Sequence, residues 1–381
     1  MENAGARLWN IQKQQRTGLC VGLDPHYDPE GDWDMDLYRS FGSSRKGRAE
    51  DLRSAFEMLR ATLRHFGTMW DGQTVEFLTG LTIYILTVIE AARDAGIQVF
   101  KPQAAFYEQF KEASPIILGL VSQHLRDQNV DIFAALDAKR GDIDTTQFPY
   151  YTVYPNDGET MPGVKGYGFD AMTVTTWMGE DVLSPGLPFF KVGKGAIVVT
   201  RTSNPSGTTL QDLLVSPSDV SLTEKQEPFR YTVARHQELI SILGRMPRAY
   251  EVMLYLTTLF SRDNGLDVDG VSPIFSVMGA TVPMDGGFRR IRGNGAIPLI
   301  PGFGAQKGPF KNVQSLIVRE GPLTGMWGML SSSRENMFAW LPKYGGKGDP
   351  MLLADEVRRS IDNFRKDERD AYAVAGVDYP F

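Results

Sequence analysis

The stretch DIFAALDAKRGDIDTT, residues 131–146, runs from an apolar segment straight into a cluster of charged side chains. The apolar part has the length and composition of a strand that is buried on both faces. Within a regular strand, Asp137 and Lys139 would project to the same face, because they have i, i+2 spacing. Asp142 follows shortly after Lys139. The stretch therefore predicts a buried strand that ends in a charged site.

Seven further apolar runs end in polar or Gly-rich residues, namely residues 18–24, 97–103, 170–176, 196–203, 272–280, 296–305 and 328–334. Helical patterns lie between several of them, at residues 51–66, 75–96 and 114–128. Continuous apolar strands that alternate with amphipathic helices imply a parallel sheet covered on both faces. Eight such strands predict an α/β fold, a closed (β/α)8 TIM barrel with helical and loop insertions.

An open, doubly wound sheet is the structural alternative. GFGAQKG, residues 302–308, resembles part of a dinucleotide fingerprint, but its spacing is wrong and it follows the seventh run rather than the first. We expect one barrel domain over residues 1–381. The additional length is expected in two insertions, a polar loop near 28–51 and a helical segment near 215–265.

Composition limits the partners and the compartment. The net charge of -6 argues against nucleic acid or an anionic membrane as a partner. The apolar segment at residues 77–96 is too short and too charged to span a bilayer, so we expect a core helix. The start of the chain has no apolar signal-peptide region. The single cysteine, Cys20, cannot form an internal disulfide, which is typical of a cytoplasmic protein.

Charged residues follow the first three strand runs: Asp24, then Lys101, then Asp137 with Lys139. The carboxyl ends of barrel strands share one mouth, so these carboxylates and ammonium groups are expected in one pocket. Neighbouring carboxylates keep a lysine protonated, and a rigidly held protonated lysine is a general acid that can quench a carbanion. The alternative is a structural network of ion pairs at the barrel rim.

Two later stretches have the features of a phosphate site. The loops after the seventh and eighth strands of a barrel commonly bind phosphate through backbone N–H groups and an arginine. GFGAQKG would supply Gly304 and Gln306, and SSSR (331–334) would supply Arg334 as a bidentate ligand. RRIRGNG, residues 289–295, is more typical of a solvated loop than of a binding patch.

No metal site is predicted, because the histidines are scattered and lack metal-ligand spacing. They are His26, His65, His124 and His236.

Taken together, these stretches resemble one family, the orotidine 5'-phosphate decarboxylases, and within it the longer bacterial type 2 branch. The matching motifs occur in the family's order over residues 15–340: LCVGLDP, FKPQAAFYEQF, DAKRGDI, DAMTVTTWMGED, TRTSNPSG, VMGAT, PGFGAQKG and SSSR. The resemblance implies removal of CO2 from orotidine monophosphate to give uridine monophosphate, with no metal and no organic cofactor.

The resemblance also implies a role for each member of the charge array. Lys139 would protonate C6 of the pyrimidine, and Asp137 would lie beside the substrate carboxylate. Lys101 would bridge the charge array and the ribose, and Asp24 would bind a ribose hydroxyl.

Further roles follow from the same resemblance. Ser203 would contact the pyrimidine edge, Gln306 would span base and phosphate, and Arg334 would bind phosphate. Asp142 and Thr146 would enter the neighbouring subunit's site, which implies a homodimer with shared active sites.

The chain departs from the family's pattern at Asp144, where glycine is common, and at Lys307, which replaces a glycine. Two other functions remain open. A metal-dependent sugar-phosphate decarboxylase or aldolase of the same superfamily also uses DxKxxD, but such enzymes lack the KPQAAFYE and SNP contexts. A non-catalytic nucleotide-binding barrel would be expected to have lost a member of the charge array, and none is lost.

Overall fold

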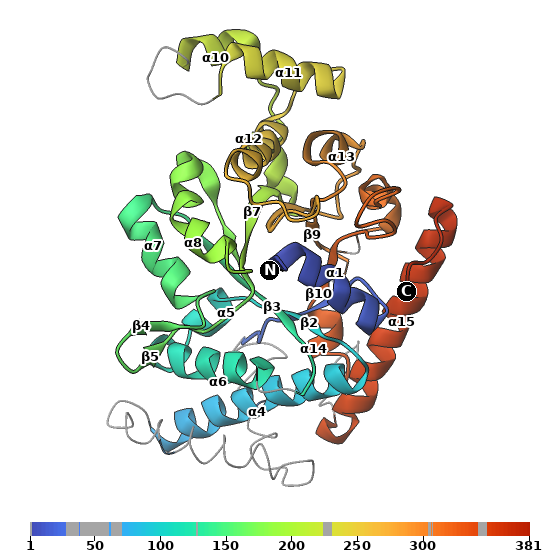
Figure 1. Ribbon diagram of the computed structural model, residues 1–381. Coiled ribbons are helices and arrows are strands. Elements are labelled where there is room, and N and C mark those ends of the chain that lie inside the picture. The colour runs from blue at the N-terminus through green and yellow to red at the C-terminus, as the bar shows by residue number, and fades with distance from the viewer. Residues whose placement is uncertain are drawn as a thin grey trace. The chain divides into compact units, whose positions relative to one another are not determined.

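Eight strands form one closed parallel barrel, in the spatial order β1-β10-β9-β8-β7-β6-β3-β2 (Figure 1). The computed structural model describes residues 2–27, 38, 61, 71–126, 129–223, 231–303, 306, 308–341 and 349–381. The barrel strands are β1 (Leu19–Leu23), β2 (Val99–Pro102), β3 (Phe133–Arg140), β6 (Ala171–Val174), β7 (Gly195–Arg201), β8 (Ile274–Met278), β9 (Pro298–Pro301) and β10 (Met329–Ser332). Each overlaps one of the eight apolar runs, so the predicted TIM barrel is confirmed.

The strands form where the sequence is continuously apolar. β1, β6 and β8 are buried at every position, as expected for parallel strands covered on both faces. Neighbouring barrel strands pair in parallel, for example Val99 with Phe133 and Ala171 with Gly195. The carboxyl ends of neighbouring strands therefore lie at the same edge of the sheet, which is where the polar residues of each motif begin.

The chain divides into two compact units. The first comprises Met1–Leu19, Lys139–Ser331 and Glu368–Phe381, and the second comprises Cys20–Ala138 and Ser332–Asp367. That residues 1–381 act as one domain stays a prediction.

Helices and short elements surround the strands in both units. The first unit contains α1 (Ala4–Gln15), α7 (Asp144–Val153), the hairpin β4 (Glu159–Met161) with β5 (Val164–Lys165), η2 (Thr176–Val182), η3 (Ser184–Gly186), α8 (Leu187–Phe190), η4 (Pro205–Gly207), α9 (Thr208–Gln211), α10 (Pro217–Thr223), α11 (Val233–Leu243), α12 (Ala249–Asp263), α13 (Gly287–Arg292) and η5 (Phe310–Leu316). The second contains α4 (Gly72–Asp94), α5 (Ala105–Glu108), η1 (Lys111–Ala113), α6 (Ser114–Arg126), α14 (Arg334–Met337) and η6 (Pro350–Leu352). Helix α15 (Leu353–Ala375) has residues in both.

Helix α4 is the long apolar segment, and it is a core helix. It is long and apolar enough to cross a membrane, but 78% of its most apolar window is buried inside the protein. Its first turn is capped by Asp71, whose carboxylate accepts a hydrogen bond from Thr74 N at 2.7 Å. The buried hydroxyls of Thr79 and Thr82 donate to the carbonyls of Val75 and Leu78, which satisfies these polar groups within the helix.

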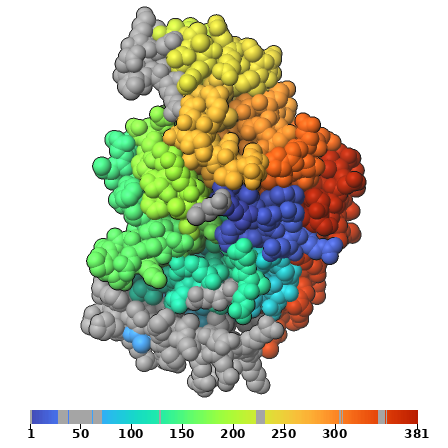
Figure 2. Space-filling view, in the orientation of Figure 1, coloured from blue at the N-terminus to red at the C-terminus, as the bar shows by residue number. Residues whose placement is uncertain are grey.

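Of the two predicted insertions, the structure describes much of the one near 215–265 but little of the one near 28–51. The polar loop near 28–51 and the helix expected at 51–66 lie outside the described residues, apart from single positions. The segment near 215–265 is helical as predicted and forms α10, α11 and α12. Helix α12 packs against β7 and β8, whereas α10 and α11 pack together and project beyond α12 (Figures 1 and 2).

The expectation of a solvated loop at RRIRGNG was wrong. Residues 287–292 form α13, and Arg292 is only 7% exposed. Arg292 Nη2 donates to the carbonyl of Ile274, at the start of β8, and Arg289 Nη1 donates to the carbonyl of Ala296 at 2.6 Å, just before β9. These arginines satisfy backbone carbonyls at the amino-terminal side of the strands, so their role is structural.

We predict that Cys20 is chemically inert in the folded protein. Burial raises the pKa of its thiol to about 12, although the Lys101 ammonium acts in the opposite direction. At pH 8 the native protein should not react with iodoacetamide within hours, because the thiolate is the nucleophile and is neither formed nor accessible. The same protein in guanidinium chloride should label at one site, which mass spectrometry would count. Rapid labelling of the native protein would contradict this burial.

Candidate active site

A buried ion pair joins the ends of β2 and β3. Lys101 is 4% exposed and Asp137 is 8% exposed, and Lys101 Nζ donates to Asp137 Oδ2 at 3.1 Å. Gln103 Nε2 donates to the same oxygen at 3.0 Å. The two strands run parallel here, with a bridge between Gln103 and Asp137. The structure thus places together two residues that are far apart in the sequence.

The electrostatics of this pair keep the lysine charged. Burial alone lowers the pKa of Lys101, but the carboxylates of Asp137 and Asp24 raise it, and the net pKa lies above the ordinary value. Lys101 is therefore an ammonium ion at neutral pH despite its burial. A buried ammonium beside a carboxylate therefore acts as a fixed positive charge and is poorly suited to donate a proton.

Asp24 follows the end of β1 and carries an unsatisfied oxygen. Its Oδ1 is buried, and no donor in the described part of the chain reaches it, while its backbone N–H donates to Met337 Sδ at 2.9 Å. A buried carboxylate oxygen without a donor is costly unless a ligand hydroxyl supplies the hydrogen bond. Asp24 is thus suited to bind a hydroxyl group.

His26 lies close to the same group of residues. Its ring contacts Phe106 edge-on at 4.4 Å and stacks on Phe338 at 5.8 Å between centroids. Burial lowers the pKa of His26, Asp24 opposes this, and Arg334 lowers it further. Arg334 is exposed at the start of α14, just after β10.

Lys139 has an exposed side chain on a fixed backbone. Its φ of 49° lies in the left-handed region, which costs a non-glycine residue about 1 kcal/mol. Its backbone N–H donates to Thr173 Oγ1 at 2.8 Å, and the carbonyl of Arg140 accepts from Thr175 N at 2.8 Å. The i, i+2 argument for a shared face with Asp137 does not hold here, because the backbone is no longer extended.

Asp142 and Thr146 lie at the start of α7. The backbone N–H of Asp142 donates to the buried Gln147 side chain at 3.0 Å, and Asp142 Oδ1 accepts from Ile143 N at 2.8 Å. Thr146 is exposed. Asp144 is the first residue of α7, where a carboxylate interacts favourably with the helix dipole, so it has a local structural explanation.

The side chains of Ser203 and Gln306 both approach Gly302. A Cβ on Gly302 would fall 2.9 Å from Gln306 Oε1 and 3.4 Å from Ser203 Cβ, and Gly302 has a φ of 109°. The loop closes through Gly308 N, which donates to the Gly302 carbonyl at 2.8 Å. Two residues assigned to substrate binding are thus brought together, whereas Gly304 and Lys307 lie outside the described residues.

Sequence reasoning missed Gln103, Thr173 and His26 as members of the site. Gln103 and Thr173 stand inside recognised motifs near strand ends, and His26 comes two residues after Asp24, so position was the available signal. Among the described residues, no group of three or more His, Cys, Asp or Glu side chains is arranged to hold a metal ion.

Comparisons with known proteins agree on one family. The model of the orotidine 5'-phosphate decarboxylase / HUMPS family matches residues 18–226. The chain is 31% identical over 330 residues to the orotidine 5'-phosphate decarboxylase of Rhodopirellula baltica, covering 85% of each chain. It is 29% identical over 296 residues to that of Verminephrobacter eiseniae, covering 74% of this chain and 89% of the relative.

A solved structure agrees with the fold. The crystal structure of the orotidine 5'-monophosphate decarboxylase of Plasmodium berghei matches with a TM-score of 0.65 and 16% identity, covering 98% of this chain and 99% of that one. At that identity the likeness concerns the fold alone.

We predict that Asp137→Asn destabilises the protein by about 3 kcal/mol, because removing one partner leaves a buried ammonium without its counter-charge. The double variant with Lys101→Met should recover most of this loss. The change Glu356→Gln, which breaks an exposed ion pair with Arg359, is the control and should stay within about 0.5 kcal/mol. Urea unfolding measures all of these. Equal costs for Asp137→Asn and Glu356→Gln would refute the buried pair.

Proposed function

Because the chain belongs to the orotidine 5'-phosphate decarboxylase / HUMPS family, and is accordingly a carboxy-lyase, we propose that it converts orotidine monophosphate to uridine monophosphate and CO2. The observation that carries the proposal is the buried Lys101–Asp137 pair at the ends of β2 and β3, with Lys139 following on the same strand. The reaction serves pyrimidine biosynthesis, and its site needs no metal and no organic cofactor.

In the proposed mechanism, the bond between C6 and the carboxylate breaks and its electron pair stays on C6. The ammonium of Lys139 stabilises this developing carbanion and then gives its proton to C6. The resulting neutral amine regains a proton from solvent. Asp137 lies beside the departing carboxylate, and Lys101 keeps Asp137 ionised and in place.

The other predicted residues bind the nucleotide. Asp24 accepts from a ribose hydroxyl, which would satisfy its buried Oδ1. Ser203 contacts the pyrimidine edge, and Gln306, which like Ser203 lies close to Gly302, spans base and phosphate. Arg334 and the backbone of Gly304 bind the phosphate, whose binding energy helps to hold the base in place.

The metal-dependent sugar-phosphate enzymes of the same superfamily are the competing activity. The relatives from Rhodopirellula baltica and Verminephrobacter eiseniae favour the decarboxylase, since both are orotidine 5'-phosphate decarboxylases. Turnover of orotidine monophosphate in the presence of EDTA would separate the two. We place the reaction in the cytoplasm, because a protein with a single cysteine and no disulfide is typical of this reducing compartment. We assign no nucleic acid or membrane partner.

We propose that the enzyme is a homodimer with shared active sites. Apolar side chains are exposed on α7 and η2, two elements that pack together. Phe148 is 43% exposed and Trp177 is 79% exposed, which is unusual for aromatic residues in a monomer. Thr146 lies in the first turn of α7 and Asp142 just before the helix, so a partner that covers the start of α7 would lie close to both residues.

We predict that Lys139→Ala lowers kcat by at least about 10³-fold, because the general acid is lost. Thermal stability and binding of uridine monophosphate, the proposed product, should be far less affected than turnover. The matched control is Lys165→Ala, an exposed lysine on the β4–β5 hairpin, which should leave kcat unchanged. Substantial turnover by Lys139→Ala would remove Lys139 from the acid role.

We predict that two inactive variants complement each other. Lys139→Ala and Asp142→Ala homodimers should each be nearly inactive, since every site lacks one group. After the two are mixed and reassociated, half of the dimers are mixed, and one site in each is intact, so about a quarter of wild-type activity should return. If activity does not return although mass spectrometry finds mixed dimers, Asp142 does not act in the partner's site.

A further inference from the structure

Arg201, the last residue of β7, is a buried arginine held entirely by protein groups. It is 1% exposed, and it forms a bidentate pair with Asp212, with Nε to Oδ1 at 2.9 Å and Nη2 to Oδ2 at 2.8 Å. Its Nη1 donates to the carbonyl of Thr202 at 2.6 Å and to Gln211 Oε1 at 3.3 Å. Because its planar guanidinium group binds several partners at once, Arg201 fixes the conformation of the surrounding backbone.

The backbone that it fixes is the loop that carries Ser203. Gln211 Oε1 also accepts from the backbone N–H of Thr202 at 2.9 Å and from its hydroxyl at 3.1 Å. On the other side, Thr281 Oγ1 donates to the Ser203 carbonyl at 2.6 Å. Gly279 lies so close that a Cβ there would be 2.6 Å from Ser203 Cα. The position of Ser203 is therefore determined by residues that need not touch a nucleotide.

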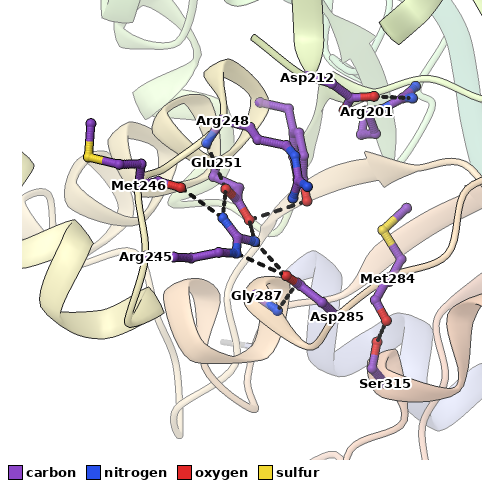
Figure 3. A network of polar contacts seen from close by, with 11 residues as sticks. Arg201, Asp212, Arg245, Met246, Arg248, Glu251, Met284, Asp285, Gly287 and Ser315 are labelled. Atoms are coloured by element: carbon purple, nitrogen blue, oxygen red, sulfur yellow. Dashed lines mark hydrogen bonds and ion pairs between the residues drawn. The ribbon is translucent and has the colours of Figure 1, made fainter. Parts of the chain in front are cut away.

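A second charged network supports the loop after β8. The guanidinium of Arg245 lies between Glu251 and Asp285 (Figure 3), with Nη2 2.6 Å from Glu251 Oε1 and 2.5 Å from Asp285 Oδ2. Glu251 is fully buried. Next to Asp285, the carbonyl of Met284 accepts from Ser315 Oγ at 2.9 Å.

The two networks are linked through the backbone. The residue after Asp212 is Leu213, whose carbonyl accepts from Ala249 N at 2.8 Å. Arg248, the N-cap of α12, donates its backbone N–H to Glu251 Oε2 at 2.7 Å. Hydrogen bonds and short stretches of backbone thus connect the Ser203 loop, through the start of α12, with the loop after β8.

We propose that Arg201 is a positioning residue of the nucleotide site and acts through Ser203, and that the helical segment near 215–265 supplies the outer support. The inference rests on the proposed function, in which Ser203 contacts the pyrimidine edge. Arg201 has no role in the chemistry itself. It holds the Ser203 loop in the geometry that the base requires, and small misplacements of such contacts cost up to about 10²-fold in rate.

A double-mutant cycle between Arg201 and Ser203 tests this proposal, with kcat and KM measured for orotidine monophosphate decarboxylation. Arg201→Lys keeps the charge but loses the fork, and it should raise KM about tenfold, as should Ser203→Ala. In the Ser203→Ala background, Arg201→Lys should cost less than about twofold, because the contact through which it acts is already gone. A purely stabilising role would give the same cost in both backgrounds, and that result overturns the proposal.

Two further variants keep the test decisive. If Arg201→Lys does not fold, Gln211→Met takes its place in the cycle, since it removes the acceptor that binds Thr202, and an additive result with it overturns the proposal equally. The control is Asp170→Asn, which breaks the ion pair with Arg7 at the start of β6 and should lower Tm without changing KM in either background. A wild-type protein with no decarboxylase activity would instead refute the proposed function, so the two failures are distinguishable.

Discussion

Burial of the Lys101 ammonium is the constraint on which the candidate site depends. Removing this charge from water is costly, and it is offset only because Asp137 lies 3.1 Å away and Asp24 adds a second negative charge nearby. The parallel register of β2 and β3 provides that arrangement, since a shift of one residue would turn the side chains to the other face. The buried charges are stabilised only when β2 and β3 pair in the correct register. A shifted register would leave Lys101 buried without its carboxylate partner and would therefore be strongly destabilised.

The strands were predictable because their signal is local. Each barrel strand is a short continuous apolar run that ends in glycine or polar residues, and all eight runs became strands. That Lys101 and Asp137 lie close together also followed, because the carboxyl ends of adjacent parallel strands meet at one edge of the sheet, whereas their direct ion pair is seen only in the structure. What the sequence could not give is the backbone at Lys139, since a positive φ in a lysine has no sequence signal of its own. The regular alternation of a strand was therefore extended one residue too far.

Side-chain partners that lie far apart along the chain were the other limit. The sequence RRIRGNG looks solvated because it is strongly basic, yet Arg289 and Arg292 are used to satisfy carbonyls that precede β9 and lie in β8. The bidentate pair of Arg201 with Asp212 was equally hidden, because TRTSNPSG draws attention to its serine and not to its arginine. In both cases an arginine fork binds several backbone or carboxylate acceptors, and only the folded chain shows which acceptors are within reach.

The two lysines of the charge array differ in burial and pairing, and the proposed mechanism gives them different roles. Lys101 is buried and forms an ion pair with Asp137, and the nearby carboxylates raise the pKa of its ammonium group. This ammonium is therefore a poor proton donor to a substrate. Lys139 has an exposed side chain on a backbone held by Thr173, which is the combination that a proton donor needs: access to the reacting carbon and a fixed origin. The same separation applies to the proposed nucleotide site, in which Ser203 would contact the base and Arg201 is enclosed by protein groups. In the proposed mechanism, a buried charge fixes the local geometry and a more accessible side chain contacts the substrate, which is how preorganised sites keep the cost of reorganisation out of the reaction step.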